Sequence, residues 1–167
     1  TSAYPLLLCE NWHSLASDLD ALESNCISVV AVIDPLAEVS YETLTRAFTH
    51  RLSPLKMHFL IKFNREVTFS KNHRRNILKA SQVLEVTRIE NKQDVTLDWC
   101  SLYKNLCFRH DISSHALFSP SSLEKQLMLP EVDAFAAYHG QEVVGMALFT
   151  RYHDKIYYHL GAQSTTG

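Results

Sequence analysis

The stretch VDAFAAYHGQEVVGMALFTRYHDKIYYHLGA, residues 132–162, contains three runs rich in β-branched and aromatic residues, as is typical of β-strands. These runs are 132–139, 142–152 and 155–162. Gly140-Gln141 and His153-Asp154 separate them, and each pair is short enough to form a tight hairpin turn. The sequence therefore predicts two consecutive hairpins, which form an antiparallel β-meander.

Helical patterns come before the meander. Ser70 can cap a helix that runs to about residue 80, with Ile77, Leu78 and 80–83 turned inward, and a strand is expected over 84–89. A longer helix is predicted over 94–109, because apolar residues recur there at helical spacing. Ser119 precedes Pro120, so a short helix should start there and end near Met128.

The first part of the chain also alternates between element types. We expect a helix over about 12–22, a buried strand over 27–33, a helix capped by Ser40, and a strand over 57–62. This alternation favours a mixed α/β (α+β) fold over a helical bundle or a β-sandwich.

The composition excludes several classes. A net charge of −2 provides no overall field that would attract nucleic acid or an anionic membrane. The cysteines form no Cys-x-x-Cys pair, so free buried thiols are expected, and the histidines lack the spacing of metal ligands. The apolar run Leu6–Leu8 is too short for a signal peptide or a membrane span, and a cytoplasmic location is the default expectation.

A cluster of cations, Lys71, His73, Arg74, Arg75 and Lys79, lies at the expected start of the helix after Ser70. Positive charge near a helix N-terminus opposes the macrodipole, which a bound phosphate or carboxylate would relieve. The alternative is that these side chains are simply solvated and pair with acidic residues elsewhere.

Two further places could carry chemistry. Arg109 leaves the last turn of the 94–109 helix, where helix capping alone would also explain it. In the last strand, alternation predicts that Tyr157 and His159 share one face and that Tyr158 and Leu160 share the other. A Tyr or His beside the small residues Gly161 and Ala162 could donate a proton to a substrate, or could belong to an aromatic packing cluster.

Several segments together resemble the FemAB-like branch of the GNAT acyltransferase superfamily: SKNHRRNILKA (70–80), the helix Trp99–Arg109, FAAYHGQEVVGMALF (135–149) and YYHLGA (157–162). The resemblance covers residues 70–167 well and 1–69 loosely. It implies a partial first GNAT-like unit over 1–69 and an incomplete second, acyltransferase unit over 70–167.

The resemblance also implies a function, the transfer of an acyl or aminoacyl group from a thioester or ester donor to a small-molecule or peptide-like amine. The donor would be acyl-CoA or aminoacyl-tRNA, and nucleic acid would be a partner only in the second case. Tyr158 and His159 would act as proton donors or anchors, Arg109 as an anion clamp, and Lys71, Arg74 and Arg75 as steering charges. The donor-binding loop of the family is missing here, so we expect either a fragment or a lost activity.

Two other functions stay open at this point. The 71–79 helix could make the chain a noncatalytic module that binds phosphates or nucleic acid, although the near-neutral charge counts against this. Alternatively, the exposed edge of the meander could belong to a structural half-domain that needs a partner, which includes a possible homo-oligomer.

Overall fold

The computed structural model describes residues 6–55, 57–112 and 117–164. The chain divides into two compact units, Thr1–Val67 and Thr68–Gly167, and each is described here by itself. The boundary that the sequence suggested, between residues 69 and 70, lies close to this division.

In the N-terminal unit a short parallel pair of strands accompanies two helices. Strand β1 (Leu6–Leu7) pairs with β2 (Val32–Ile33), and the helices are α1 (Leu15–Asp20) and α2 (Tyr41–Ala47). The predicted start of α2 is confirmed, because the Ser40 side chain accepts a hydrogen bond from the backbone N–H of Thr43. Helix α1 is shorter than the expected 12–22.

Two predicted strands of the N-terminal unit are wrong. Only Val32 and Ile33 of the run 27–33 form a strand, and Ile27 and Val30 are 108% and 86% exposed. The described part of 57–62 forms no strand, and Phe59 is 98% exposed. Strand propensity is decided by packing against neighbours, and within the described part of the chain residues 27–31 and 57–62 pair with no strand.

The C-terminal unit begins with the expected helices. Helix α3 (Lys71–Ala80) starts where Ser70 accepts from the N–H of His73, and α5 (Pro120–Met128) starts where Ser119 accepts from the N–H of Ser122. A 3₁₀ turn, Lys92–Val95, leads into α4 (Thr96–Arg109). The inward side that was predicted for α3 is wrong, since none of its residues is buried and Ile77 and Leu78 are 44% and 65% exposed.

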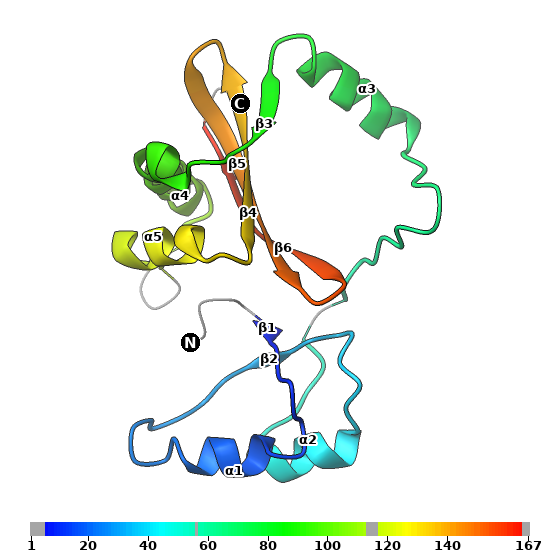
Figure 1. Ribbon diagram of the computed structural model, residues 1–167, viewed down its shortest axis with the longest axis vertical. Coiled ribbons are helices and arrows are strands. Elements are labelled where there is room, and N and C mark those ends of the chain that lie inside the picture. Colours follow the sequence, from blue (N-terminus) through cyan, green and yellow to red (C-terminus); the bar gives the residue numbers. More distant parts are fainter. Residues whose placement is uncertain (1–5, 56, 113–116, 165–167) are drawn as a thin grey trace. The chain divides into compact units, whose positions relative to one another are not determined.

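The predicted meander is confirmed. Strands β3 (Glu85–Arg88), β4 (Val132–His139), β5 (Glu142–Tyr152) and β6 (Lys155–Gln163) form a four-stranded antiparallel sheet in the order β3-β4-β5-β6. Helices α4 and α5 both cover the same face of this sheet (Figure 1). The unit is therefore a mixed α/β structure with an antiparallel sheet that follows its helices.

The core lies between the sheet and these two helices. On the sheet side it consists mainly of alternate residues of β4 and β5, such as Met146 and Leu148 of β5, and on the helix side it includes Trp99 and Leu127. Leu148, Trp99 and Leu127 are 0% exposed, and Met146 is 4% exposed. The opposite face of the sheet, called the open face below, carries Phe135, Phe149 and Tyr158 on adjacent strands.

An irregularity in β6 decides which side chains reach each face. Leu148 pairs with Leu160 and the next residue, Phe149, pairs with Tyr158, so His159 is an extra residue in a β-bulge. Leu160 consequently packs against the core, whereas Tyr158 belongs to the open face. The expectation that Tyr158 and Leu160 share a face is wrong, because strict alternation fails across a bulge.

Within the described residues no helix is both long and apolar enough to cross a bilayer. All four cysteines are free thiols, and only Cys107 is buried.

Candidate functional site

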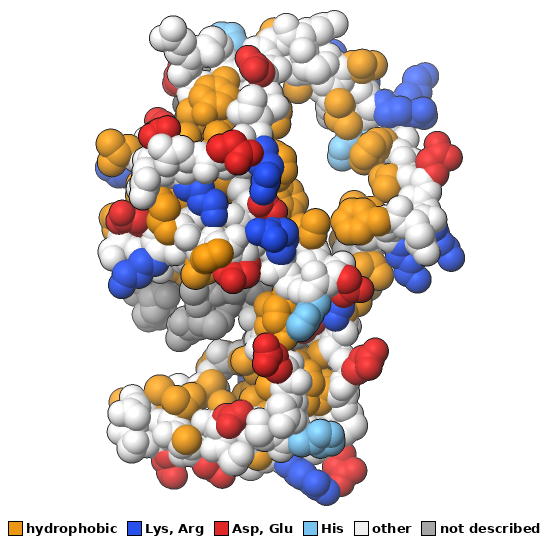
Figure 2. All heavy atoms as spheres, viewed as in Figure 1, with side chains coloured by type: hydrophobic (Ala, Val, Ile, Leu, Met, Phe, Trp, Pro, Cys, Tyr) orange, Lys and Arg blue, Asp and Glu red, His pale blue; other side chains and the backbone are white. Residues whose placement is uncertain are grey.

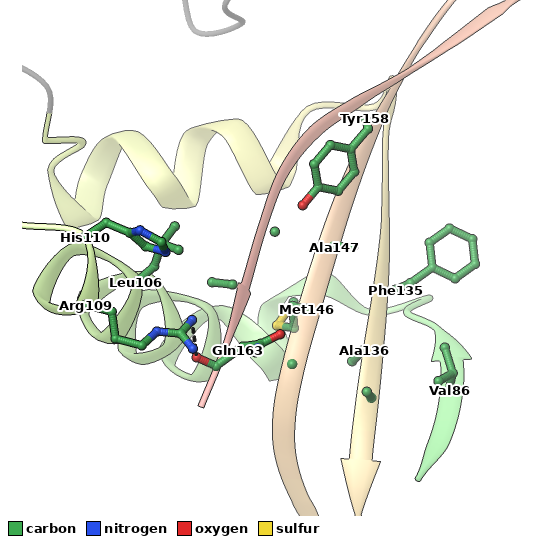
Figure 3. Close-up of a pocket in the computed structure, with 14 residues that line it drawn as sticks. Val86, Leu106, Arg109, His110, Phe135, Ala136, Met146, Ala147, Tyr158 and Gln163 are labelled. Carbon is green, nitrogen blue, oxygen red and sulfur yellow. Dashed lines mark hydrogen bonds between the residues drawn. The ribbon is translucent and has the colours of Figure 1, made fainter. Parts of the chain in front are cut away.

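The C-terminal unit contains a hollow of about 750 Å³. Its lining combines the open face of the sheet with the last turn of α4, so the hollow extends past the end of edge strand β6 (Figure 3). Residues of the open face that line it include Val86, Phe135, Ala147 and Tyr158, and those of the α4 end are Leu106, Arg109 and His110.

Small residues form much of the lining along β5 and β6. Gly145, Ala147, Gly161 and Ala162 all border the hollow, and they leave the strand backbone accessible there. The Tyr158 ring lies over Gly161. A Cβ atom placed on this glycine would overlap the Tyr158 Oη and would lie 3.2 Å from the Tyr158 Cζ. A glycine at 161 is therefore required for the observed position of the Tyr158 ring.

The open-face aromatics hold Tyr158 from its other side. The ring of Phe149 contacts both Phe135 and Tyr158 edge to face, with centroid distances of 5.7 and 5.6 Å. Tyr158 is still 63% exposed, and its hydroxyl points into the hollow (Figure 3). No described residue forms a hydrogen bond with that hydroxyl, so it is available to a ligand.

Arg109 enters the hollow from the last turn of α4. Its guanidinium donates to the backbone carbonyl of Gln163 at 3.4 Å, a long contact that leaves most of its N–H groups to other acceptors (Figure 3). Within the described part of the chain Arg109 forms no ion pair, and no Asp or Glu lines the hollow. Among the residues that the structure describes, the site thus offers one permanent positive charge without a counter-ion.

His159 lies away from the hollow. Its Nε2 donates to the side-chain Oε1 of Gln126 in α5 at 2.6 Å, while the Gln126 amide donates to Ser122 Oγ at 3.1 Å. This orientation of the amide requires the proton on Nε2 of a neutral imidazole. Burial lowers the pKa of His159 to about 4, which keeps the ring neutral near pH 7.

The three predicted steering cations lie on α3, and none of them lines the hollow. Lys71, Arg74 and Arg75 are exposed, and basic side chains project from this helix (Figure 2). Arg75 donates to the Asn72 side chain at 2.8 Å, and no ion pair to any of the three occurs among the described residues. The structure therefore brings Arg109 and Tyr158 together and leaves the α3 cations and His159 elsewhere.

Sequence reasoning missed Gln126, which is 1% exposed and fixes His159. A signal for it existed: Gln126 lies between Leu123 and Leu127 on the apolar side of α5, and Ser122 is placed one helical turn before it to satisfy its amide. A buried polar residue in such a position requires a partner from another element.

Across residues 6–55, 57–112 and 117–164, no group of three or more His, Cys, Asp or Glu side chains could hold a metal ion. The hollow instead offers one guanidinium, one imidazole at His110, one phenol and an apolar lining. In comparisons with known proteins, the chain matches no protein-family model and no curated protein.

Proposed function

We propose that the C-terminal unit is an acyltransferase unit that moves an acyl or aminoacyl group from a thioester or ester to an amine. The observation that carries this proposal is the convergence of Arg109 and Tyr158 on one hollow with a glycine- and alanine-rich lining. The resemblance of residues 70–167 to FemAB-like GNAT proteins adds the reaction class.

The reaction needs little from the protein beyond orientation and one proton. The nitrogen of a neutral amine attacks the acyl carbon, a C–N bond forms, and the C–S or C–O bond to the leaving group breaks. Tyr158 gives its phenolic proton to the leaving sulfur or oxygen, and it regains a proton from the nitrogen of the new amide. The Tyr158 hydroxyl suits this role because it points into the hollow and forms no hydrogen bond with any residue that the structure describes.

Arg109 would bind a negative group on the substrate or donor. Its guanidinium presents a planar fork of donors, and the hollow contains no acidic side chain that would compete for them. His159 has no part in the proposed step, because its imidazole is held by Gln126 on the helix-covered side of the sheet.

The test is turnover by the full chain with acetyl-CoA and a panel of amines, followed by mass spectrometry of the acetylated product. We expect Tyr158→Phe to lower kcat by about 10- to 100-fold, in line with loss of a general acid. Arg65→Gln, which changes an exposed arginine outside the hollow, is the matched control and should leave kcat unchanged. Absence of product with any thioester or aminoacyl ester, or full activity of Tyr158→Phe, would refute the proposal.

A second candidate function is noncatalytic phosphate binding by α3. It is favoured by one observation, that Lys71, Arg74 and Arg75 are exposed together on one helix without a described ion pair. Binding of single-stranded RNA that falls steeply with salt, and that is lost in a triple Lys71/Arg74/Arg75→Gln variant, would support this function instead.

A further inference from the structure

The lining of the hollow restricts the chemistry of its ligand, and this restriction deepens the proposed function on which it rests. We infer that the acceptor in the transfer is an amine that also carries a carboxylate, joined to a slender apolar body.

Charge comes first. Arg109 is the one permanently charged side chain in the lining, and it has no carboxylate partner within the described part of the chain. The adjacent imidazole of His110 can donate a further hydrogen bond at the same end of the hollow (Figure 3). One guanidinium balances a single negative charge and matches the two oxygens of a carboxylate, whereas a phosphate dianion would require additional cations.

Shape and polarity identify the rest of the ligand. Beyond Arg109 the lining continues over Gly145, Ala147 and Gly161, whose small or absent side chains leave a shallow trough along the strands. Val86, Leu106 and Phe135 make its borders apolar. A slender hydrocarbon body can cover these groups and exclude water from them, while a second charge in the middle of the trough would find no partner.

Among the described residues of the lining, Tyr158 contributes the only hydroxyl, and Arg109 and Tyr158 come from different elements, α4 and β6. A ligand anchored by its carboxylate at Arg109 and lying in the trough would present its amine within the part of the hollow that the Tyr158 hydroxyl faces (Figure 3). In this arrangement Arg109, His110 and Tyr158 each contact the ligand. The remaining polar residue of the lining, Gln163, accepts the hydrogen bond of Arg109 through its backbone carbonyl.

The experiment measures equilibrium binding in the absence of any donor, so its outcome is independent of turnover. The full chain, labelled with ¹⁵N, is titrated with hexanoate, 6-aminohexanoate, hexylamine and hexyl phosphate, and the backbone amides of Gly145, Ala147 and Gly161 are followed by NMR. We expect hexanoate and 6-aminohexanoate to shift these amides at concentrations at which hexylamine does not.

Variants assign the anion contact. Arg109→Gln should weaken hexanoate binding by about tenfold or more, as loss of a charge-assisted hydrogen bond predicts, and Arg109→Lys should fall in between because it keeps the charge without the planar fork. Arg65→Gln, which changes an exposed arginine outside the lining, should bind hexanoate as the unchanged chain does.

Three results would overturn the inference: equal binding of hexylamine and hexanoate, a preference for hexyl phosphate over hexanoate, or unchanged hexanoate affinity in Arg109→Gln with folding verified by circular dichroism. If hexanoate and 6-aminohexanoate bind as expected but no transfer occurs with any donor, the carboxylate site stands and the proposed reaction fails.

Discussion

The two faces of the C-terminal sheet are made of the same strands but meet different surroundings. On one face the β5 residues Met146 and Leu148 are buried in the core that the sheet forms with α4 and α5. On the other, Ala147 and Phe149 remain partly exposed and border or support the hollow. The covered face provides the stability of the unit, and the open face can consequently keep glycine, small residues and an exposed tyrosine where a ligand could lie.

The strongest way to test this difference is to truncate neighbouring residues that point to opposite faces. Leu148→Ala creates a cavity in the core and should lower the free energy of unfolding by about 2 to 5 kcal/mol. Phe149→Ala removes a partly buried ring with two edge-to-face partners, for which we expect a loss of about 1 to 2 kcal/mol.

Urea unfolding of both variants, followed by Trp99 fluorescence in a Trp12→Phe background, provides the measurement, because Trp99 lies in the core of the C-terminal unit. If the two substitutions lowered the free energy of unfolding equally, both faces of the sheet would be covered in solution. The two faces would then not differ as the structure indicates.

The same contrast separates what the sequence could predict from what it could not. The strands of the meander and the starts of α2, α3 and α5 follow from local signals, namely turn pairs and capping serines that act within a few residues. The run 27–33 has an equally strong β-branched composition, yet only Val32 and Ile33 find a strand partner. Pairing and covering depend on distant residues, which local composition does not specify.

The candidate site was predictable in the same partial way. Arg109 and Tyr158 were selected from the sequence, and both line the hollow. His159 was selected beside Tyr158, but a bulge between two strands places it against Gln126, and bulges leave no reliable trace in a single sequence. The role of Gly161 depends on the Tyr158 ring above it, which only the folded backbone reveals.

A pH titration tests how firmly the covered face excludes charge at His159. Burial lowers the pKa of this imidazole to about 4 from an ordinary value of 6.5, so the unfolded chain binds its proton first. Stability should be complete above pH 6.5 and should fall between pH 6.5 and 4 as acid is added. Because the ring is only partly buried, solvent screening reduces the effect, and we expect about 1 to 2 kcal/mol.

His159→Gln is the matched variant for this titration, since its amide can still donate to Gln126 and does not titrate. The difference in unfolding free energy between the two proteins should change with pH in this window and be constant above it. Parallel curves from pH 7 to pH 4 would mean that the imidazole is as accessible to protons as in the unfolded chain.

The smallest expected effect on stability, and the most local one, concerns the open face. In Gly161→Ala the new Cβ collides with the Tyr158 hydroxyl, so the ring must move from its place above residue 161. The ring is exposed and can swing outward, and alanine also restricts the unfolded chain, so the net change in stability should stay within about 1 kcal/mol.

Gly145→Ala is the control on the neighbouring strand, because its Cβ would meet only ordinary contacts of 3.7 to 3.9 Å. The measurement is a nuclear Overhauser effect between the ring of residue 158 and the α-protons of residue 161. It should be present in the unchanged chain and in Gly145→Ala, and absent in Gly161→Ala. Adding Tyr158→Phe to Gly161→Ala should partly restore it, because this second substitution removes the colliding oxygen. Its persistence in Gly161→Ala would show that Tyr158 does not rest on this glycine, and that the open face shapes the hollow in some other way.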